Sequence, residues 1–244
     1  MTHPTFPGAT GVSRLDVYDS LAPDGLVGGT PHVHLVSTEA YVVTAGRGKL
    51  MTIDGAGLRE TSLAEGAVVW FTPGTIHRAV NEGGLRVVVL MSNAGLPEAG
   101  DAVMTFPPEV LADPVSYADA TSLGDGDDES RAAQATRRRD LAVAGFSILR
   151  DAAEAGDPAP LAAFYTAAAR LVRGRAHDWS ALIERGPLAQ ANRSLERVRA
   201  LADGLVPSYD DATVQTAPPS PGARGFGMCG RLRTYDLRGG PRPR

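Results

Sequence analysis

The sequence is poor in residues on which several large protein classes depend. Cys229 is its one cysteine, which excludes an internal disulfide and a metal site built from several thiolates. Lys49 is its one lysine, so 23 of the 24 basic residues are arginine. No apolar run approaches the roughly 20 residues that a membrane-spanning helix needs. The opening residues lack a basic start and an apolar stretch, so we predict no secretory signal and a cytoplasmic, reduced location.

The chain also lacks a strong charge of either sign. Its 244 residues carry 24 basic and 28 acidic side chains, a formal net charge of -4. Residues 1–100 have a net charge of -3 (6 basic, 9 acidic), and residues 101–244 have a net charge of -1 (18 basic, 19 acidic). Neither part has the positive excess that is typical of proteins that bind a phosphate backbone. We therefore predict that the protein binds neither nucleic acid nor a membrane.

The pattern of residues changes near Pro97. Before it, short segments of alternating polarity are separated by glycine-containing turns, which predicts an antiparallel sandwich or barrel. After it, alanine, arginine and leucine recur at helical spacing. We expect one helix ending near residue 155, a second beginning near 158, and a third ending near Gly204.

These patterns predict a protein that is mainly β, with an added helical region. We divide the chain into a β-barrel, a linker, a helical extension and a loop-rich tail that contains a final strand. These four parts are residues 1–97, 98–130, 131–205 and 206–244.

Candidate metal ligands lie in two segments of the β region. His32 and His34 stand two residues apart on a predicted strand, so both imidazoles project from the same face. Glu39 follows after a short turn, and Tyr41 shares its face by parity. His77 follows a Pro-Gly turn at the entry to another strand. Three imidazoles and one carboxylate inside a barrel match the ligand set of a divalent first-row metal.

These two segments resemble the two signature motifs of the cupin superfamily. The matching positions are His32, His34, Glu39 and Gly46 in the first motif, and Gly66, Gly74, His77 and Asn81 in the second. One departure is Thr72, where the family often has proline; here proline follows at position 73. The resemblance covers roughly residues 13–95. It implies a jelly-roll β-barrel with an internal metal bound by His32, His34, Glu39 and His77.

Three classes of function remain open. The first is a metal-dependent oxygenase acting on a small organic molecule, with one Fe(II) ion favoured and Mn, Ni, Zn or Cu as alternatives. The second is a redox-neutral isomerase, epimerase or lyase, which needs a base besides the metal ligands. Tyr41, Glu60 and Glu65 are the candidates for that base. The third is a non-catalytic ligand sensor, in which the barrel controls a DNA-binding helical part. The net charge of -1 over residues 101–244 disfavours it.

Several other residues receive expectations that the structure can test. We predict Tyr41 as the catalytic residue, a hydrogen-bond donor to the substrate, with core packing as the alternative. Trp70 and Phe71 have opposite parities, so one should line the barrel and the other cover its outside. The run 137–139 (RRR) should be a solvated helix face, and Cys229 should be inert. We expect a homodimer, formed through barrel faces or the added helices.

Overall fold

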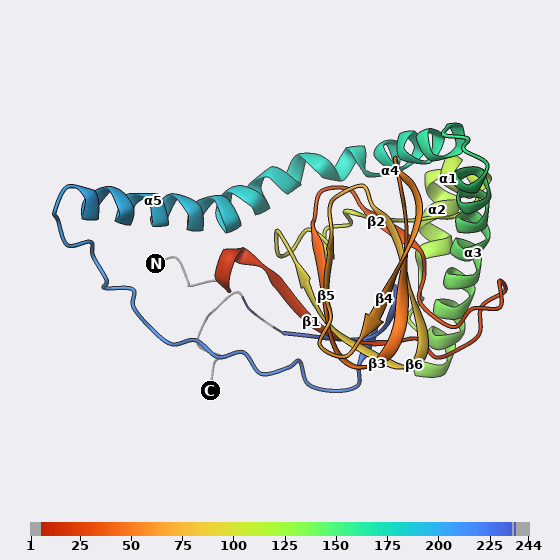
Figure 1. The fold of residues 1–244 in the computed structure, drawn as a ribbon, viewed down its shortest axis with the longest axis horizontal. Coiled ribbons are helices and arrows are strands. Elements are labelled where there is room, and N and C mark those ends of the chain that lie inside the picture. Colours follow the sequence, from red (N-terminus) through yellow and green to blue (C-terminus); the bar gives the residue numbers. More distant parts are fainter. Residues whose placement is uncertain (1–5, 236, 238–244) are drawn as a thin grey trace.

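A computed structural model describes residues 6–235 and residue 237, and its strands form a single antiparallel sheet that closes into a barrel (Figure 1). A short 3-10 turn, Pro7–Ala9, precedes the first strand. The strands are β1 (Gly11–Val17), β2 (His32–His34), β3 (Glu39–Asp54), β4 (Gly57–Ala64), β5 (Val68–Phe71), β6 (Ile76–Met91), β7 (Ala102–Met104), β8 (Gly225–Phe226) and β9 (Gly230–Thr234). They pair in the order β4-β3-β6-β1-β9-β8, while β5 pairs with β3, and β2 pairs with both β6 and β7. The expected fold class, a β-barrel followed by a helical region, is confirmed.

The two long strands differ from the shorter segments expected from the sequence. β3 and β6 each run for 16 residues, through glycines that the sequence pattern marks as turns. Their pairing register shifts between Val43 and Gly48, as in a β-bulge. Gly46 has a φ of 73°, and a Cβ atom there would lie 2.3 Å from the carbonyl oxygen of Gly84. Glycine is therefore needed at this bulge for its backbone conformation and for the close approach of β6.

The barrel has an apolar interior that the sequence alternation anticipated. Tyr41, Val43 and Phe71 are buried in one cluster with residues from β1, β4 and β6. Trp70, the neighbour of Phe71, is 70% exposed, so the two rings do lie on opposite faces of the strand. Cys229 joins the same cluster, although it lies just before β9 near the other end of the chain.

Helices cover one outer face of the barrel (Figure 1). They are α1 (Pro108–Ala112), α2 (Pro114–Thr121), α3 (Asp128–Glu154), α4 (Ala159–Ile183), a π-helical turn (Glu184–Leu188) and α5 (Ala189–Ala202). A second apolar cluster joins the outward side chains of the sheet, such as Ile53 and Val80, to Phe146 of α3 and Phe164 of α4. Among the described residues, no helix combines the length and the apolar composition needed to cross a bilayer.

The segment 98–130, expected to be a linker, contains regular structure. β7 pairs with β2, so the sheet extends beyond residue 97. α2 begins at Pro114, where the carboxylate of Asp113 accepts hydrogen bonds from the backbone N–H groups of Val115 and Ser116. An aspartate cap followed by proline is a favourable helix start, but α1 and α2 are too short to show helical periodicity in the sequence.

The arginine run in α3 is not the solvated face that we expected. Arg138 and Arg139 are 7% and 2% exposed, respectively. Arg138 donates to the carbonyl oxygen of Gly227 (2.8 Å), and Arg139 donates to those of Ser20 (2.9 Å) and Leu21 (2.8 Å). These guanidinium groups bond α3 to loops of the barrel, whose free carbonyls a sequence pattern cannot reveal.

Candidate metal centre

Three strands bring the four predicted ligands together. His32 and His34 lie on β2, Glu39 begins β3, and His77 is the second residue of β6. His32 pairs directly with His77 across the β2–β6 ladder. One ligand atom from each of the four residues lies within 4.8 Å of the others. The convergence that the sequence predicts is therefore present in the structure.

The cluster is buried and centred on one carboxylate oxygen. Oε2 of Glu39 lies 3.3 Å from Nε2 of His34 and 3.2 Å from Nε2 of His77. The ring centroids of His32 and His77 are 4.2 Å apart. All four residues are at most 5% exposed. Their donor atoms face one another in a space that is nearly closed to water.

Each histidine is oriented by a hydrogen bond from its other ring nitrogen. Nδ1 of His32 donates to the carbonyl of Thr30 (2.9 Å), and Nδ1 of His77 donates to that of Thr75 (3.1 Å). Nδ1 of His34 is 2.6 Å from Oδ1 of Asp101. A carbonyl oxygen can only accept, so His32 and His77 carry a proton on Nδ1, and the lone pair of either ring in its neutral form is on Nε2. This arrangement is typical of histidines that bind metals.

Two atoms of the cluster show that a metal ion fits there. Oε2 of Glu39 and Nε2 of His77 are buried and lie 3.2 Å apart, but neither makes a hydrogen bond of acceptable geometry with a described residue. Leaving such groups unsatisfied in a protein interior costs free energy, whereas a cation between them would satisfy both. The four residues could therefore hold a metal ion, and the donor set of three nitrogens and one oxygen suits a first-row divalent ion.

The electrostatics of the protein alone already favour a charged carboxylate in the cluster. Burial raises the pKa of Glu39, but His77 and His34 outweigh it and hold that pKa well below its usual range. Burial also lowers the pKa of His32 well below its usual value, with the neighbouring histidines acting in the same direction. Burial acts likewise on His34, but Asp101 and Glu39 outweigh it and raise the pKa of His34 to about 9. An anionic Glu39 and a neutral His32 are the forms that a metal requires.

Asp101 is a site residue that the sequence analysis missed. It is fully buried, and Oδ2 accepts a hydrogen bond from the backbone N–H of Ser37 (2.8 Å) while Oδ1 contacts His34. Burial raises its pKa, but His34 and Ser37 outweigh this effect and lower it. Asp101 lies 67 positions after His34 in the segment expected to be a linker, so no motif spacing connects the two residues.

Tyr41 and Cys229 lie beside the cluster. The Tyr41 ring is fully buried and packs edge-to-face on Phe71, which in turn lies 4.3 Å from the ring of His77. The Tyr41 hydroxyl is 3.9 Å from Sγ of Cys229, and that sulfur is 4.0 Å from Nδ1 of His32. Burial raises the pKa of Tyr41 well above its usual value and that of Cys229 to about 12. Both groups are therefore neutral near pH 7.

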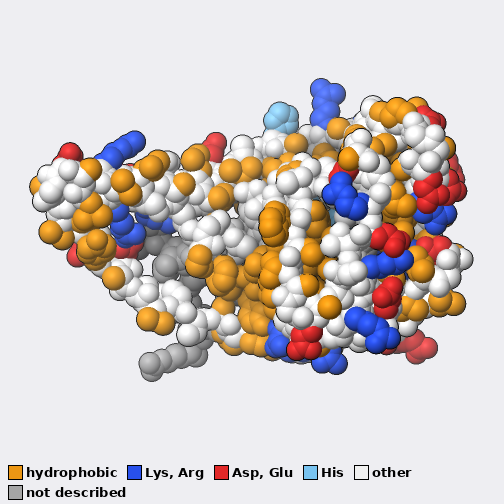
Figure 2. Space-filling model, in the orientation of Figure 1, with side chains coloured by type: hydrophobic (Ala, Val, Ile, Leu, Met, Phe, Trp, Pro, Cys, Tyr) orange, Lys and Arg blue, Asp and Glu red, His pale blue; other side chains and the backbone are white. Residues whose placement is uncertain are grey.

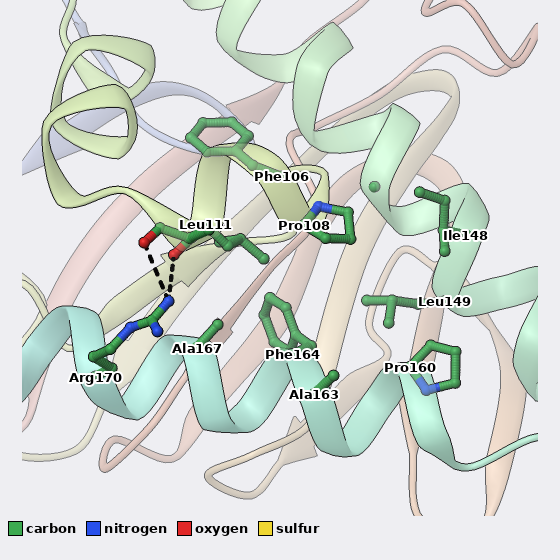
Figure 3. A pocket seen from close by; sticks show the side chains of 12 residues that line it. Phe106, Pro108, Leu111, Ile148, Leu149, Pro160, Ala163, Phe164, Ala167 and Arg170 are labelled. Atoms are coloured by element: carbon green, nitrogen blue, oxygen red, sulfur yellow. Dashed lines mark hydrogen bonds between the residues drawn. The ribbon is translucent and has the colours of Figure 1, made fainter.

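A separate cavity of about 220 Å³ lies among the helices (Figure 3). Phe106, Leu111 and Phe164 line it, and Arg170 stands at one side, donating to the carbonyls of Leu111 (3.4 Å) and Ala112 (3.3 Å). It contains no histidine, carboxylate or thiol among its lining residues. The residues that could hold a metal ion are therefore those of the buried cluster and do not line this cavity.

Comparison with known proteins bears on the barrel alone. The cupin domain family matches residues 18–93, which include all four residues of the cluster. The chain contains a cupin domain. It has no match among the curated proteins.

Solved structures resemble parts of the chain at low identity. A protein with a double-stranded β-helix domain from Klebsiella pneumoniae is 20% identical over 34% of this chain and 64% of its own, with a TM-score of 0.26. A TDP-fucose-3,4-ketoisomerase from Campylobacter jejuni is 15% identical over 32% of this chain and 58% of its own (TM-score 0.28). A cupin 2 conserved barrel domain protein from Salinispora arenicola is 24% identical over 40% of this chain and 75% of its own (TM-score 0.29). The chain thus spans less than two thirds of the length of the first two.

Proposed function

We propose that this cupin protein is a metal-dependent enzyme that acts on a small organic molecule, and that its chemistry is that of an oxygenase. The observation that carries the proposal is the buried cluster of His32, His34, Glu39 and His77, whose ring Nδ1 atoms are already engaged. A site that only stabilised the fold would not need two buried polar atoms without partners.

In this proposal the four residues are the ligands of one divalent ion. Fe(II) is favoured, with Mn, Ni, Zn and Cu as alternatives, because histidines and a carboxylate that leave positions open are the usual ligands of non-haem iron oxygenases. Bound there, iron supplies redox chemistry with molecular oxygen. Glu39 provides the negative charge that offsets part of the charge of the cation.

The protein itself supplies orientation and a dry environment. The hydrogen bond to Asp101 fixes the ring of His34, and Phe71 packs against the ring of His77. The apolar barrel interior excludes bulk water, which strengthens the electrostatic interactions of the site. Tyr41, which is neutral and close to the cluster, is the residue that we assign as hydrogen-bond donor to the substrate.

Redox-neutral chemistry ranks second because none of the residues considered as its general base is both close to the cluster and a good base. Glu60 is 47% exposed in its side chain and pairs with Lys49 at 2.9 Å. Glu65 is exposed at the turn between β4 and β5. Asp101 is committed to His34 and Ser37. Among the described residues, the candidate that remains beside the cluster is Tyr41, whose raised pKa makes it a poor base.

A DNA-binding regulator ranks third. Two of the three arginines in the run 137–139 are buried against barrel loops, so this run offers no basic surface for a phosphate backbone. Residues 101–244, which include all the helices α1 to α5, also carry a net charge of -1.

Metal analysis combined with oxygen uptake tests the proposal. We expect protein purified without chelators to contain about one iron per chain, and to consume oxygen when a panel of small organic acids, thiols and phenols is added. A second sample, stripped of metal and reloaded with zinc, serves as the control and should consume none. Full turnover of a substrate without oxygen consumption would move the assignment to isomerase or lyase chemistry. Protein that binds no first-row metal would contradict the proposal altogether.

A further inference from the structure

The cavity among the helices has a buried floor and an exposed rim (Figure 3). We call it the helix cavity; residues of α1, α3 and α4 line its volume of about 220 Å³. Its floor consists of four large side chains that are at most 6% exposed. They are Phe106, Leu111, Leu149 and Phe164. Ile148 at the rim is 44% exposed, so the cavity is open to solvent on this side.

The lining residues explain why the cavity exists and what kind of molecule suits it. Ala163 and Ala167 of α4 point into it, and their side chains are too short to fill the space (Figure 3). Apart from Arg170, none of the described residues that line it has a polar side chain. An apolar cavity of about 150 Å³ stays dry and binds benzene, because water finds too few polar partners there. The helix cavity therefore favours an apolar occupant somewhat larger than benzene.

Arg170 gives the helix cavity a single positive charge. Its Nη2 atom donates to the carbonyl oxygens of Leu111 (3.4 Å) and Ala112 (3.3 Å), which is longer than the usual range of about 2.7–3.2 Å. None of the ion pairs between described residues includes Arg170. A guanidinium group that has no acidic partner and stands beside an apolar cavity is suited to the carboxylate of a bound ligand.

The charge along the helix cavity is asymmetric. Its lining residues on α4 run from Pro160 to Arg170, a rise of about 15 Å at about 1.5 Å per residue. Glu154 and Asp157 are exposed where α3 is joined to α4, shortly before Pro160, and acidic side chains gather at that end of the molecule in Figure 2. These carboxylates repel an anion, whereas Arg170 at the other end attracts it. An elongated ligand is therefore oriented with its carboxylate at Arg170 and its apolar part toward Pro160.

We propose that the helix cavity binds a small monocarboxylic acid with an apolar body, of the size of a medium-chain fatty acid. The carboxylate pairs with Arg170, and the apolar chain lies along α4 over the ring of Phe164 and against Leu149 of α3. The site shares no residue with the buried metal cluster, so binding depends neither on a metal ion nor on the proposed enzyme chemistry. A ligand of about ten non-hydrogen atoms has a dissociation constant in the micromolar to millimolar range.

Isothermal titration calorimetry of the full-length protein with octanoate tests this inference. We expect about one octanoate per chain, with a dissociation constant below about 1 mM. Octylammonium has the same chain with the opposite charge and should show no binding at the same concentrations. Arg170→Met removes the positive charge and should weaken octanoate binding at least about tenfold. Arg173→Met is the matched control, because Arg173 is an exposed arginine of α4 that does not line the cavity; it should bind like the parent.

Ala167→Leu fills the helix cavity without changing its charge, and it should also weaken octanoate binding at least about tenfold. Ala169→Leu, on an exposed position of α4 outside the lining, is its control. Far-ultraviolet circular dichroism should show the parent fold in all four variants. A parent protein that does not bind octanoate, or equal binding in Arg170→Met, would overturn the inference. Octanoate binding that is lost in His77→Ala would place the ligand at the metal cluster and overturn it as well.

Discussion

Oδ1 of Asp101 lies 2.6 Å from Nδ1 of His34, and the other oxygen of the same carboxylate accepts a hydrogen bond from the backbone of Ser37. One buried side chain thus ties the segment before β7 to both the histidine of β2 and the turn that follows it. The contact fixes the ring of His34 and leaves its Nε2 directed at Glu39. It gives the cluster a rigid support outside its four ligands.

Asp101→Asn should weaken metal binding by about 10- to 100-fold, the usual effect of removing such a supporting group. The amide keeps the shape of the side chain but loses its charge, and its NH₂ group cannot accept from Ser37. Competition with a chromophoric chelator measures the affinity. Asp113→Asn, at the exposed cap of α2, is the control and should bind metal like the parent. Unchanged affinity in Asp101→Asn would show that the contact has no part in holding the ligand.

His77→Ala should lose most of its bound metal and all activity while keeping its fold. The substitution removes one of four ligand atoms and leaves the β2–β6 ladder intact. Elemental analysis gives the metal content, and far-ultraviolet circular dichroism reports the fold. His177→Ala removes a histidine outside the cluster and should behave as the parent. Full activity in His77→Ala would refute the role assigned to this residue.

Tyr41→Phe separates the proposed role of the hydroxyl from the packing of the ring. The ring stays against Phe71, and the hydroxyl loses its 3.9 Å contact with the sulfur of Cys229 and its interaction with the Glu39 carboxylate. We expect kcat to fall by about 100-fold or more, the usual contribution of a positioned proton donor, with metal content unchanged. Tyr209→Phe, on an exposed tyrosine, is the control. An unaltered kcat would assign Tyr41 to the core alone.

Two glycines in the helices should respond to alanine in opposite directions. A Cβ atom on Gly145 of α3 would lie 2.0 Å from the carbonyl oxygen of Thr105, so Gly145→Ala must push α3 away from the barrel. We expect it to lower the melting temperature by at least about 3 °C. Gly174 of α4 has nothing within 4 Å of that position, and Gly174→Ala should stabilise the protein by about 0.5–1 kcal/mol. Thermal unfolding followed by circular dichroism compares the two, and equal effects would contradict the packing described here.

The sequence predicted those features that depend on local pattern. Parity put His32 and His34 on one face and separated Phe71 from Trp70, because side chains alternate along any strand. The sequence pattern did not predict contacts between residues that are far apart in the chain. Gly46 and Gly84 read as turns, but they mark a bulge where two strands approach closely. Asp101, Arg138 and Arg139 bond to His34, Gly227 and Ser20, respectively, which lie more than 60 residues away in the chain. The local sequence around these three residues does not predict such contacts.

The order of the strands has a consequence for the folding of this protein during its synthesis. β9 pairs with β1, and Cys229 completes the wall beside His32, yet all the helices come before them in the chain. During synthesis on the ribosome, β1 to β7 emerge first. More than a hundred residues of helix and loop are then synthesised before β9, the partner of β1, is available for pairing. A nascent chain stalled after α5 would expose the ligands on one flank, so the enclosed cluster is among the final parts of the molecule to take shape.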